Sequence, residues 1–299
     1  MSVHRFCILM ICALGLASCQ TEVAQVLSPN QVSSNNKTPN PTVAPSITTE
    51  IKIKAKAFLH GAYDISNPLL MRDTLRSSNY LPLSQPYSAI SRFSYHKGTE
   101  QVKPAVLAIT GELAVVDWIL LELRNSASRK TFSRAALLLR NGSIVDVDGV
   151  SAVSFKDVPE ENYYIIVKHR NHLGHMSDSD HHLKDQDVFT FDFSLPETQV
   201  FGFIEIIMTS ETASLRTLPS GDANQDGIVD AFNGSAYVGT DKYIITTDIS
   251  MGAMGYLSSD VNLSSAPNAT DLNLVTTNVF LATGLSSITI SEQIPKIPL

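Results

Sequence analysis

Two segments near the C-terminal end of the 299-residue chain repeat one pattern of oxygen-bearing side chains. In the first, residues 221–229 (GDANQDGIV), Asp222, Asn224 and Asp226 stand at alternate positions and a glycine follows them. Alternate side chains can turn their oxygens inward onto one cation, and the glycine allows the loop to turn sharply. This order of residues predicts a calcium-binding loop in which Ile228 contributes its backbone carbonyl.

The second segment, residues 260–271 (DVNLSSAPNATD), has the same spacing and ends in a carboxylate. Its expected ligands are Asp260, Asn262, Ser264, the carbonyl of Ala266, Asn268 and Asp271. The similarity continues past the loops, because residues 241–248 (DKYIITTD) align without gaps on residues 271–278 (DLNLVTTN). This alignment makes Asp241, rather than Asn233, the last ligand of the first loop and implies an eight-residue insertion there.

The charge of the chain favours a cation in these loops. From residue 220 onward there are eight acidic and two basic residues, a difference of −6 within a whole-chain charge of −7. Carboxylates at this density repel one another unless a positive ion lies among them, and the acidic balance argues against a nucleic-acid partner. With three ligand carboxylates against two, the first loop should bind Ca²⁺ more tightly, and both dissociation constants should lie near about 10⁻⁴–10⁻³ M. Polar turns that hold no ion are the alternative.

The duplicated pattern over residues 220–285 resembles the dockerin domain, in which two calcium loops ending in Asp each lead into a helix. The second loop departs from that pattern, since Ser265 replaces the glycine and Ser264 replaces a carboxylate. The resemblance implies two Ca²⁺ ions and a cohesin-like partner protein. The candidate contact residues on the two helices are Lys242, Tyr243, Leu272 and Asn273.

All three cysteines lie at the start of the chain, where an eleven-residue apolar run, residues 6–16, ends in Leu-Ala-Ser-Cys. The run is too short to span a bilayer and is typical of a signal peptide over residues 1–18. LASC resembles the lipobox of bacterial lipoproteins, which implies acylation of Cys19 and anchoring in a membrane. Gln20 after the cysteine favours the outer membrane, with the periplasmic and the exposed side both open. An ordinary secretory signal is the alternative.

The rest of the chain divides by composition. Residues 19–50 are rich in Ser, Thr, Asn and Pro and predict a disordered tether. Residues 51–196 hold the predicted β domain, residues 197–219 a connector, and residues 286–299 a tail. The expected fold class is mainly β, a β-sandwich followed by a small α-helical, dockerin-like module.

Short runs of β-branched and aromatic residues predict about seven strands and no helix between residues 51 and 193. The sequence at 51–59 (IKIKAKAFL) alternates with period two, and Asn141-Gly142 predicts a type I′ hairpin between residues 132–140 and 143–147. Trp118, the only tryptophan, should anchor the core. The other expected strands are residues 106–109, 118–124, 163–169 and 188–193.

Several of these segments look like a module of secreted and surface proteins of Bacteroidetes. They are FLHGAYD, LMRDTLR, LPLSQPYS, VVDWILLELR, RAALLLRNGSIVDVDG and YYIIVKHRNHLGHMS, between residues 58 and 177. The resemblance implies a location at the cell envelope and carries no defined chemistry.

Evidence for catalysis in the β domain is weak. Five histidines fall in residues 169–182, a conceivable zinc or copper site, but their spacing lacks the helical i, i+4 pattern of zinc proteases. No GxSxG, GxGxxG or P-loop motif is present, and the pairs Glu160-Glu161 and Asp146/Asp148 suit turns and strand edges. We therefore expect a lipid-anchored surface protein that docks a partner or adheres to a glycan or matrix. The alternative is a component of polysaccharide degradation, either an enzyme or a carbohydrate-binding subunit.

Overall fold

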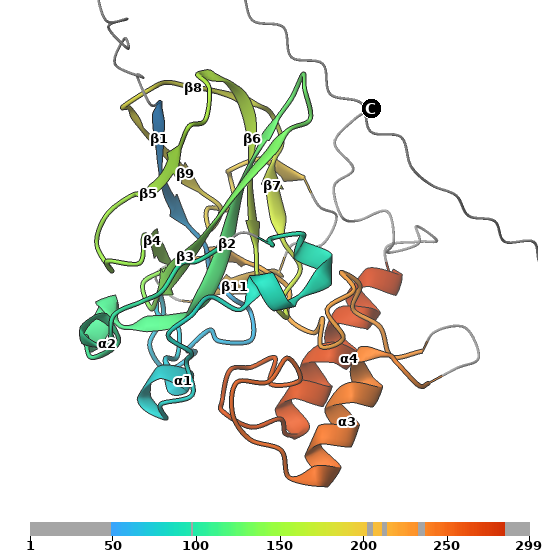
Figure 1. The fold of residues 1–299 in the computed structure, drawn as a ribbon. Helices are drawn as coiled ribbons and strands as arrows, with labels where there is room; N and C mark the ends of the chain where they lie inside the picture. The colour runs from blue at the N-terminus through green and yellow to red at the C-terminus, as the bar shows by residue number, and fades with distance from the viewer. Residues whose placement is uncertain (1–48, 97, 202–205, 211–213, 233–236, 285–299) are drawn as a thin grey trace, which may run out of the picture. The chain divides into compact units, whose positions relative to one another are not determined.

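The computed structural model describes residues 49–96, 98–201, 206–210, 214–232 and 237–284, which belong to one compact unit. The fold is mainly β, as expected (Figure 1). The strands are β1 (Glu50–Lys56), β2 (Val115–Asn125), β3 (Thr131–Leu139), β4 (Ser143–Val145), β5 (Val153–Lys156), β6 (Glu161–Lys168), β7 (His175–Ser177), β8 (His181–Leu183), β9 (Val188–Asp192), β10 (Val200–Phe201), β11 (Ile206–Thr209) and β12 (Ser214–Thr217).

Ten of these strands form one sheet in the order β10-β7-β6-β2-β3-β4-β1-β5, with β8 paired to β6 and β9 paired to β1. The pairs are antiparallel except β1 with β9. Along β1 the side chains of Ile51, Ile53 and Ala55 are buried and the lysines between them face outward, which confirms the period-two prediction. The sheet bends so far that His181 on β8 lies 4.9 Å from Phe189 on β9, measured between ring centroids.

The predicted hairpin at Asn141-Gly142 is confirmed, because β3 and β4 pair antiparallel. The predicted type I′ turn was wrong. Only Gly142 has a positive φ, +85°, whereas a type I′ turn needs positive φ at both central residues. Asn141 instead accepts a hydrogen bond from the amide of Ser143 through its side-chain oxygen (3.0 Å).

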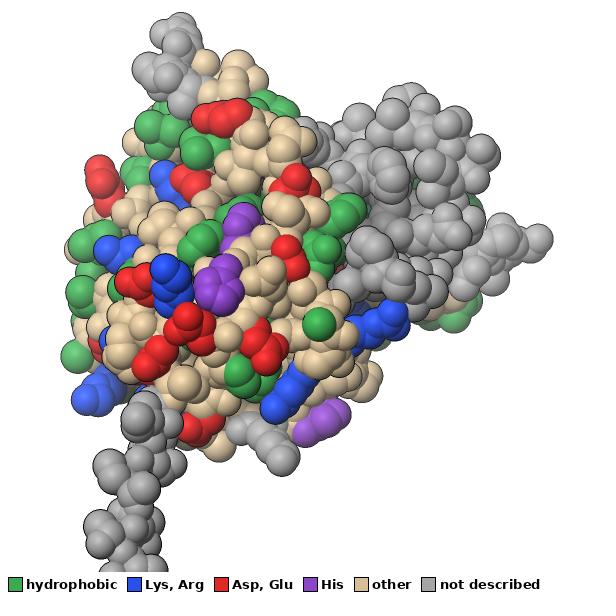
Figure 2. All heavy atoms as spheres, turned by 90° about the horizontal axis from the view of Figure 1, so that it is seen from above, with side chains coloured by type: hydrophobic (Ala, Val, Ile, Leu, Met, Phe, Trp, Pro, Cys, Tyr) green, Lys and Arg blue, Asp and Glu red, His purple; other side chains and the backbone are tan. Residues whose placement is uncertain are grey.

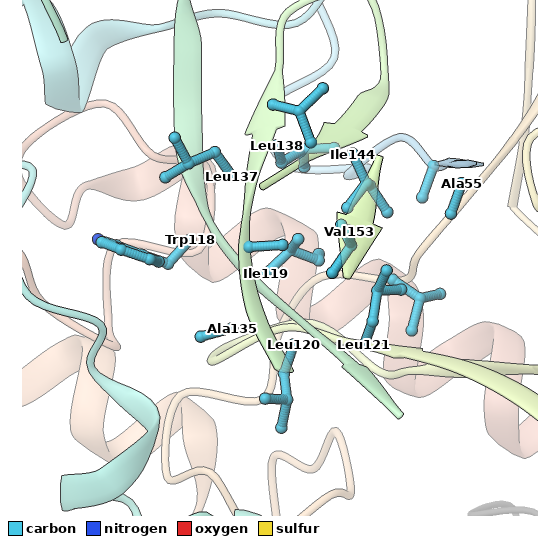
Figure 3. Packing of buried hydrophobic residues seen from close by; sticks show 14 of the residues in the cluster. Ala55, Trp118, Ile119, Leu120, Leu121, Ala135, Leu137, Leu138, Ile144 and Val153 are labelled. Atoms are coloured by element: carbon cyan, nitrogen blue, oxygen red, sulfur yellow. The ribbon is translucent and has the colours of Figure 1, made fainter. Parts of the chain in front are cut away.

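Strand β2 is buried on both faces. Ile119 and Leu121 face Val153 and the inner side of the sheet, while Trp118 lies on the opposite side (Figure 3). That second face is covered by residues 57–114, a long connection with little regular structure. Its contacts include the indole N–H of Trp118, which donates to the carbonyl of Pro82 (2.9 Å). Trp118 is fully buried, which confirms its prediction as a core anchor.

Three predictions for residues 51–193 were wrong: one strand, the number of strands and the absence of helices. The strand expected at residues 106–109 is a helical turn, α2 (Pro104–Leu107), because proline at the first helical position has the φ that a helix needs. The described part of this stretch holds nine strands rather than about seven. It also holds α1 (Thr74–Ser77) and three short 3₁₀ turns, η1 (Tyr87–Ala89), η2 (Ser91–Phe93) and η3 (Gly111–Leu113).

After the β strands the chain forms two longer helices, α3 (Asp241–Met251) and α4 (Ala269–Gly284), which pack against each other (Figure 1). Thr240 caps α3 by accepting a hydrogen bond from the amide of Tyr243, and Gly252 ends it with φ +63°. Buried Val229, Ile245 and Val275 lie in the small core under them. None of the helices in the described ranges is both long and apolar enough to cross a membrane.

At the β8 end of the sheet the surface carries mixed charges. Figure 2 shows acidic and basic side chains interspersed on this face, with hydrophobic side chains in small groups. No large patch of one charge is visible on this face.

We predict that Gly142→Ala destabilises the fold by about 2–4 kcal/mol, as positive φ strains alanine and its Cβ would collide with the buried ring of Phe58. Gly111→Ala is the matched control, because Gly111 also has a positive φ (+78°) but a Cβ there meets nothing within 4 Å. It should cost only about 1 kcal/mol. Urea unfolding followed by Trp118 fluorescence measures both; equal losses would contradict the packing argument.

Candidate functional site

The first predicted loop is organised around the carboxylate of Asp241. Its Oδ1 accepts a hydrogen bond from the amide of Asn224 (3.0 Å) and its Oδ2 accepts one from the amide of Asp230 (2.7 Å). Asn224 and Asp230 are the third and ninth residues counted from Asp222. The last residue of the loop therefore holds its two halves together, although ten residues separate Asp241 from Asp230.

The second loop has the same organisation. Asp271 Oδ1 accepts from the amide of Asn262 and Oδ2 accepts from the amide of Asn268, both at 2.8 Å. These are again the third and ninth residues, counted from Asp260. Asp241 thus occupies the place in the first loop that Asp271 occupies in the second, as the gapless alignment requires. Asn233 lies outside the described residues.

Backbone conformation repeats as well. Positive φ occurs at the fourth residue, Gln225 (+64°) and Leu263 (+56°), and at the sixth, Gly227 (+89°) and Ser265 (+80°). The amide of each sixth residue donates to the first carboxylate: Gly227 to Asp222 Oδ1 (3.2 Å), and Ser265 to Asp260 Oδ2 (2.8 Å). Ser265 therefore adopts the conformation that the missing glycine would favour.

The helices that follow the loops are equivalent too. Asp241 and Asp271 lie in the first turns of α3 and α4, and Ile245 and Val275 are both fully buried. One repeat contacts the other at both ends. Asp248 of α3 accepts a hydrogen bond from Ser259, next to the second loop, and Asn278 of α4 donates to the carbonyl of Ser220, next to the first.

The other predicted ligands lie around these carboxylates. Asp226 is exposed and its Oδ1 accepts from the amide of Ile228 (2.8 Å). In the second loop the carbonyl of Ala266 accepts from both Ser264 Oγ and Asn268 Nδ2 at 3.1 Å, so these three groups meet. The structure therefore brings several predicted ligand residues of each loop into contact with one another, whereas no contact of the Ile228 carbonyl is seen among the described residues.

Burial dominates the electrostatics of the loops. Asp222, Asp241, Asp260 and Asp271 are fully buried. Burial raises the pKa of Asp241 to about 8, with the carboxylates of Asp222 and Asp230 adding to the rise. It raises the pKa of Asp271 to about 7 and that of Asp222 to about 6, the latter despite an ion pair with Arg92. Folding thus makes three loop carboxyls unusually ready to hold a proton.

The donors fit a hard divalent cation such as Ca²⁺, because they are all oxygens and the carboxylates predominate in the first loop. An ionised carboxylate has about four acceptor positions, so the two amides bound to Asp241 or to Asp271 still leave one position on each oxygen for an ion. Within the described ranges, however, no three His, Cys, Asp or Glu side chains converge closely enough to hold a metal by themselves. Asn, Ser and backbone oxygens would have to complete either site.

Two residues of the first loop's surroundings were missed by sequence reasoning. Asp230 lies beside Asp241, its Oδ1 accepting from the Asp241 amide (3.2 Å), and alignment with Asn268 could have found it. Arg92 forms an ion pair with Asp222 from η2 in the β domain. No sequence signal points to a contact between residues 130 positions apart.

The histidine cluster does not converge on one centre. His169 and His172 are buried, with their Nδ1 atoms 3.0 Å apart, whereas His181 and His182 lie on β8. His169 Nε2 lies 3.2 Å from Oδ2 of Asp117, and His172 Nε2 accepts from the amide of Gly61. These two histidines thus belong to a hydrogen-bonded network inside the protein.

Asp117 is the centre of that network. It is fully buried and accepts hydrogen bonds from Arg170 Nε (3.0 Å) and the hydroxyl of Tyr256 (2.6 Å) besides its contact with His169. Burial alone would raise the pKa of Asp117, but Arg170, His169 and Tyr256 outweigh it and hold the pKa at about 2. The carboxylate is therefore ionised and committed to structural contacts.

The paired carboxylates of the β domain also have structural partners. Asp146 forms an ion pair with Arg134, and Asp148 accepts from Ser151 within a turn. Glu160 pairs with His182. Asp148 and Glu160 lie in a turn and a bend, as expected, but the expected edge strands were wrong, because β6, which begins at Glu161, and β4, which precedes Asp146, pair with other strands on both sides.

Cys19, the signal peptide, the tether up to residue 48 and the tail from residue 286 lie outside the described residues. Their predictions stay predictions.

The chain matches no protein-family model, and no curated protein matches it. Its function has to be argued from its own residues.

We predict that, with a chelator present, the free energy of unfolding falls as the pH rises from about 6.5 to 8.5. Folded Asp241 and Asp271 hold protons up to about pH 8 and 7, whereas unfolded aspartates release theirs near pH 3.8. Protons bound only in the folded state stabilise it at low pH, at most about 1.4 kcal/mol per pH unit each, and are lost as the pH rises. Urea midpoints measure this.

Asp241→Asn should reduce the fall of the unfolding free energy in the upper half of this pH range. Asp157→Asn, a change at an exposed site, should leave the pH dependence unaltered. A profile already flat in the unmodified chain would contradict the pKa argument.

Proposed function

We propose that this protein is a lipid-anchored protein of the cell envelope whose C-terminal, dockerin-like module binds two Ca²⁺ ions and docks a partner protein. The observation that carries the proposal is the repeated geometry of the two loops. In both, the first, third, sixth, ninth and last residues make the same hydrogen bonds. Four fully buried carboxyl groups can be ionised together only with a counter-charge, and Arg92 is the one cation paired with them in the described ion pairs.

The proposed fold of the middle domain is a β-sandwich. Its support is that Ile119 and Leu121 of β2 pack in one buried apolar cluster with Ala55 of β1 and Val153 of β5, and that Ile119 lies beside Val153 in Figure 3. The membrane anchor at Cys19 rests on the sequence alone.

Docking is favoured by the apolar surface of the module. Phe232, Val238, Met251 and Met254 are each more than 60% exposed. Near Phe232, the rings of Tyr237 and Tyr243 make an edge-to-face contact with their centroids 5.5 Å apart. Lys242 Nζ lies 5.8 Å from the centroid of the Phe232 ring. Exposed aromatic and methionine side chains of this kind are common in protein interfaces. Of the predicted contact residues, Lys242 and Tyr243 lie here.

We predict that Ca²⁺ at about 100 times its dissociation constant stabilises the chain by about 2.7 kcal/mol for each occupied loop. Calorimetric titration should find two sites, the first tighter, and thermal melts should shift upward. Asp241→Asn should remove the first site and Asp271→Asn the second, while Asp157→Asn keeps both. Absence of binding heat with Ca²⁺, or equal stabilisation by Mg²⁺, would overturn the calcium proposal.

A second prediction concerns Arg92. Its guanidinium touches Asp222, so it repels a cation bound there, and Arg92→Gln should tighten Ca²⁺ binding in the first loop by about tenfold. Arg129→Gln, an exposed change of the same charge, is the control. Weaker binding after Arg92→Gln would show instead that the arginine positions Asp222.

A further inference from the structure

One residue of the β domain, Asn171 in the connection after β6, forms hydrogen bonds with both loops. Asn171 is fully buried. Its backbone carbonyl accepts hydrogen bonds from the amides of Gly221 and Asp222, both at 3.2 Å. Its side-chain amide donates to the carbonyls of Ser258 (3.0 Å) and Asp260 (2.9 Å). Asn171 therefore holds the first ligand residue of each loop.

Two arginines of the β domain make further contacts with the second loop and with the residues just before it. Arg170 Nη1 donates to the carbonyl of Leu257 (2.5 Å), and its guanidinium lies 4.1 Å from the ring centroid of Tyr256. Arg72 Nη2 donates to the carbonyl of Asn262 (3.1 Å). Together with Asn171 these side chains satisfy four carbonyls between residues 257 and 262, which fixes the first half of the second loop before any ion binds.

Packing joins the same surfaces. Leu263 of the second loop is 1% exposed and belongs to the main hydrophobic core of the β domain. Gly61 lies directly against the backbone of Val261, so close that a Cβ there would overlap the Val261 carbonyl. The second loop is thus part of the β domain's packing as well as part of the C-terminal module.

We propose that Asn171 couples the two loops to each other and to the β domain, so that a divalent cation in either loop stabilises the whole described unit rather than the C-terminal module alone. This rests on the proposed calcium function. Asn171 is a positioning residue, since it holds the first ligand residues and is not itself a ligand. Binding and stability are then linked across the molecule.

The chain offers separate optical reporters for the two parts. Trp118, the only tryptophan, is buried in the β domain next to Asp117, whereas the two longest helices, α3 and α4, belong to the module. We would melt the full chain with CaCl₂ or a chelator and follow Trp118 fluorescence and far-ultraviolet circular dichroism. Coupling predicts that both transitions coincide and that Ca²⁺ raises both midpoints equally.

Asn171→Ala tests the residue, with Asn162→Ala, an exposed asparagine of β6, as the control. We expect Asn171→Ala, which removes the side-chain contacts with Ser258 and Asp260 but keeps the backbone carbonyl that binds the first loop, to weaken Ca²⁺ binding at the second site by about tenfold and to reduce the calcium shift of the Trp118 midpoint. If Asn171→Ala does not fold, Arg72→Gln, which frees the Asn262 carbonyl, should reduce the calcium shift of the Trp118 midpoint.

The outcomes are distinguishable. Ca²⁺ binding that shifts only the helical signal overturns the coupling and leaves the calcium sites standing. If Asn171→Ala lowers both midpoints but keeps the full calcium shift, the residue is merely stabilising and the inference is wrong. If the unmodified chain binds no Ca²⁺, the proposed function itself fails.

Discussion

The buried ion pair between Asp117 and Arg170 is the interaction on which the arrangement of this molecule depends. A carboxylate in the middle of an apolar strand loses its hydration, and only close positive and hydrogen-bonding partners compensate it. Those partners come from the connection after β6 and, through Tyr256, from the segment that leads into the second loop. Removing one partner of such a pair typically costs about 3–5 kcal/mol. The charge thus helps to fix how the β domain meets the segment between α3 and the second loop.

Much of the sheet could be predicted, because its signals are local. The alternation along β1 and the Asn-Gly turn depend on a few neighbouring residues, and both elements are present. Two features were out of reach because they depend on tertiary contacts. Strand β2 is buried on both faces because residues 57–114 cover it, and β1 pairs with β9, which lies 136 residues further along the chain. The helical turn in place of the strand expected at 106–109 was within reach, because Pro104 at its first position is a local helix-start signal.

The positions of the two loops could be predicted because their sequence signal is local and occurs twice. Ligand spacing is a property of a dozen consecutive residues, and the two copies could be checked against each other, which placed Asp241 across its insertion. Asp230 could have been included by the same alignment. Arg92 and Asn171 could not, since their contacts with the loops follow from how the chain returns to the β domain.

The fourth residues of the two loops, Gln225 and Leu263, show that the two loop sequences could not be exchanged without cost. Gln225 and Leu263 share an unusual backbone conformation, yet Gln225 is partly exposed and Leu263 fills the core of the neighbouring domain. A chain carrying the first loop's sequence in the second position would bury a glutamine amide among apolar side chains. The second loop therefore also completes the interior of the β domain, whereas the first loop has no such contact at its fourth residue and is eight residues longer.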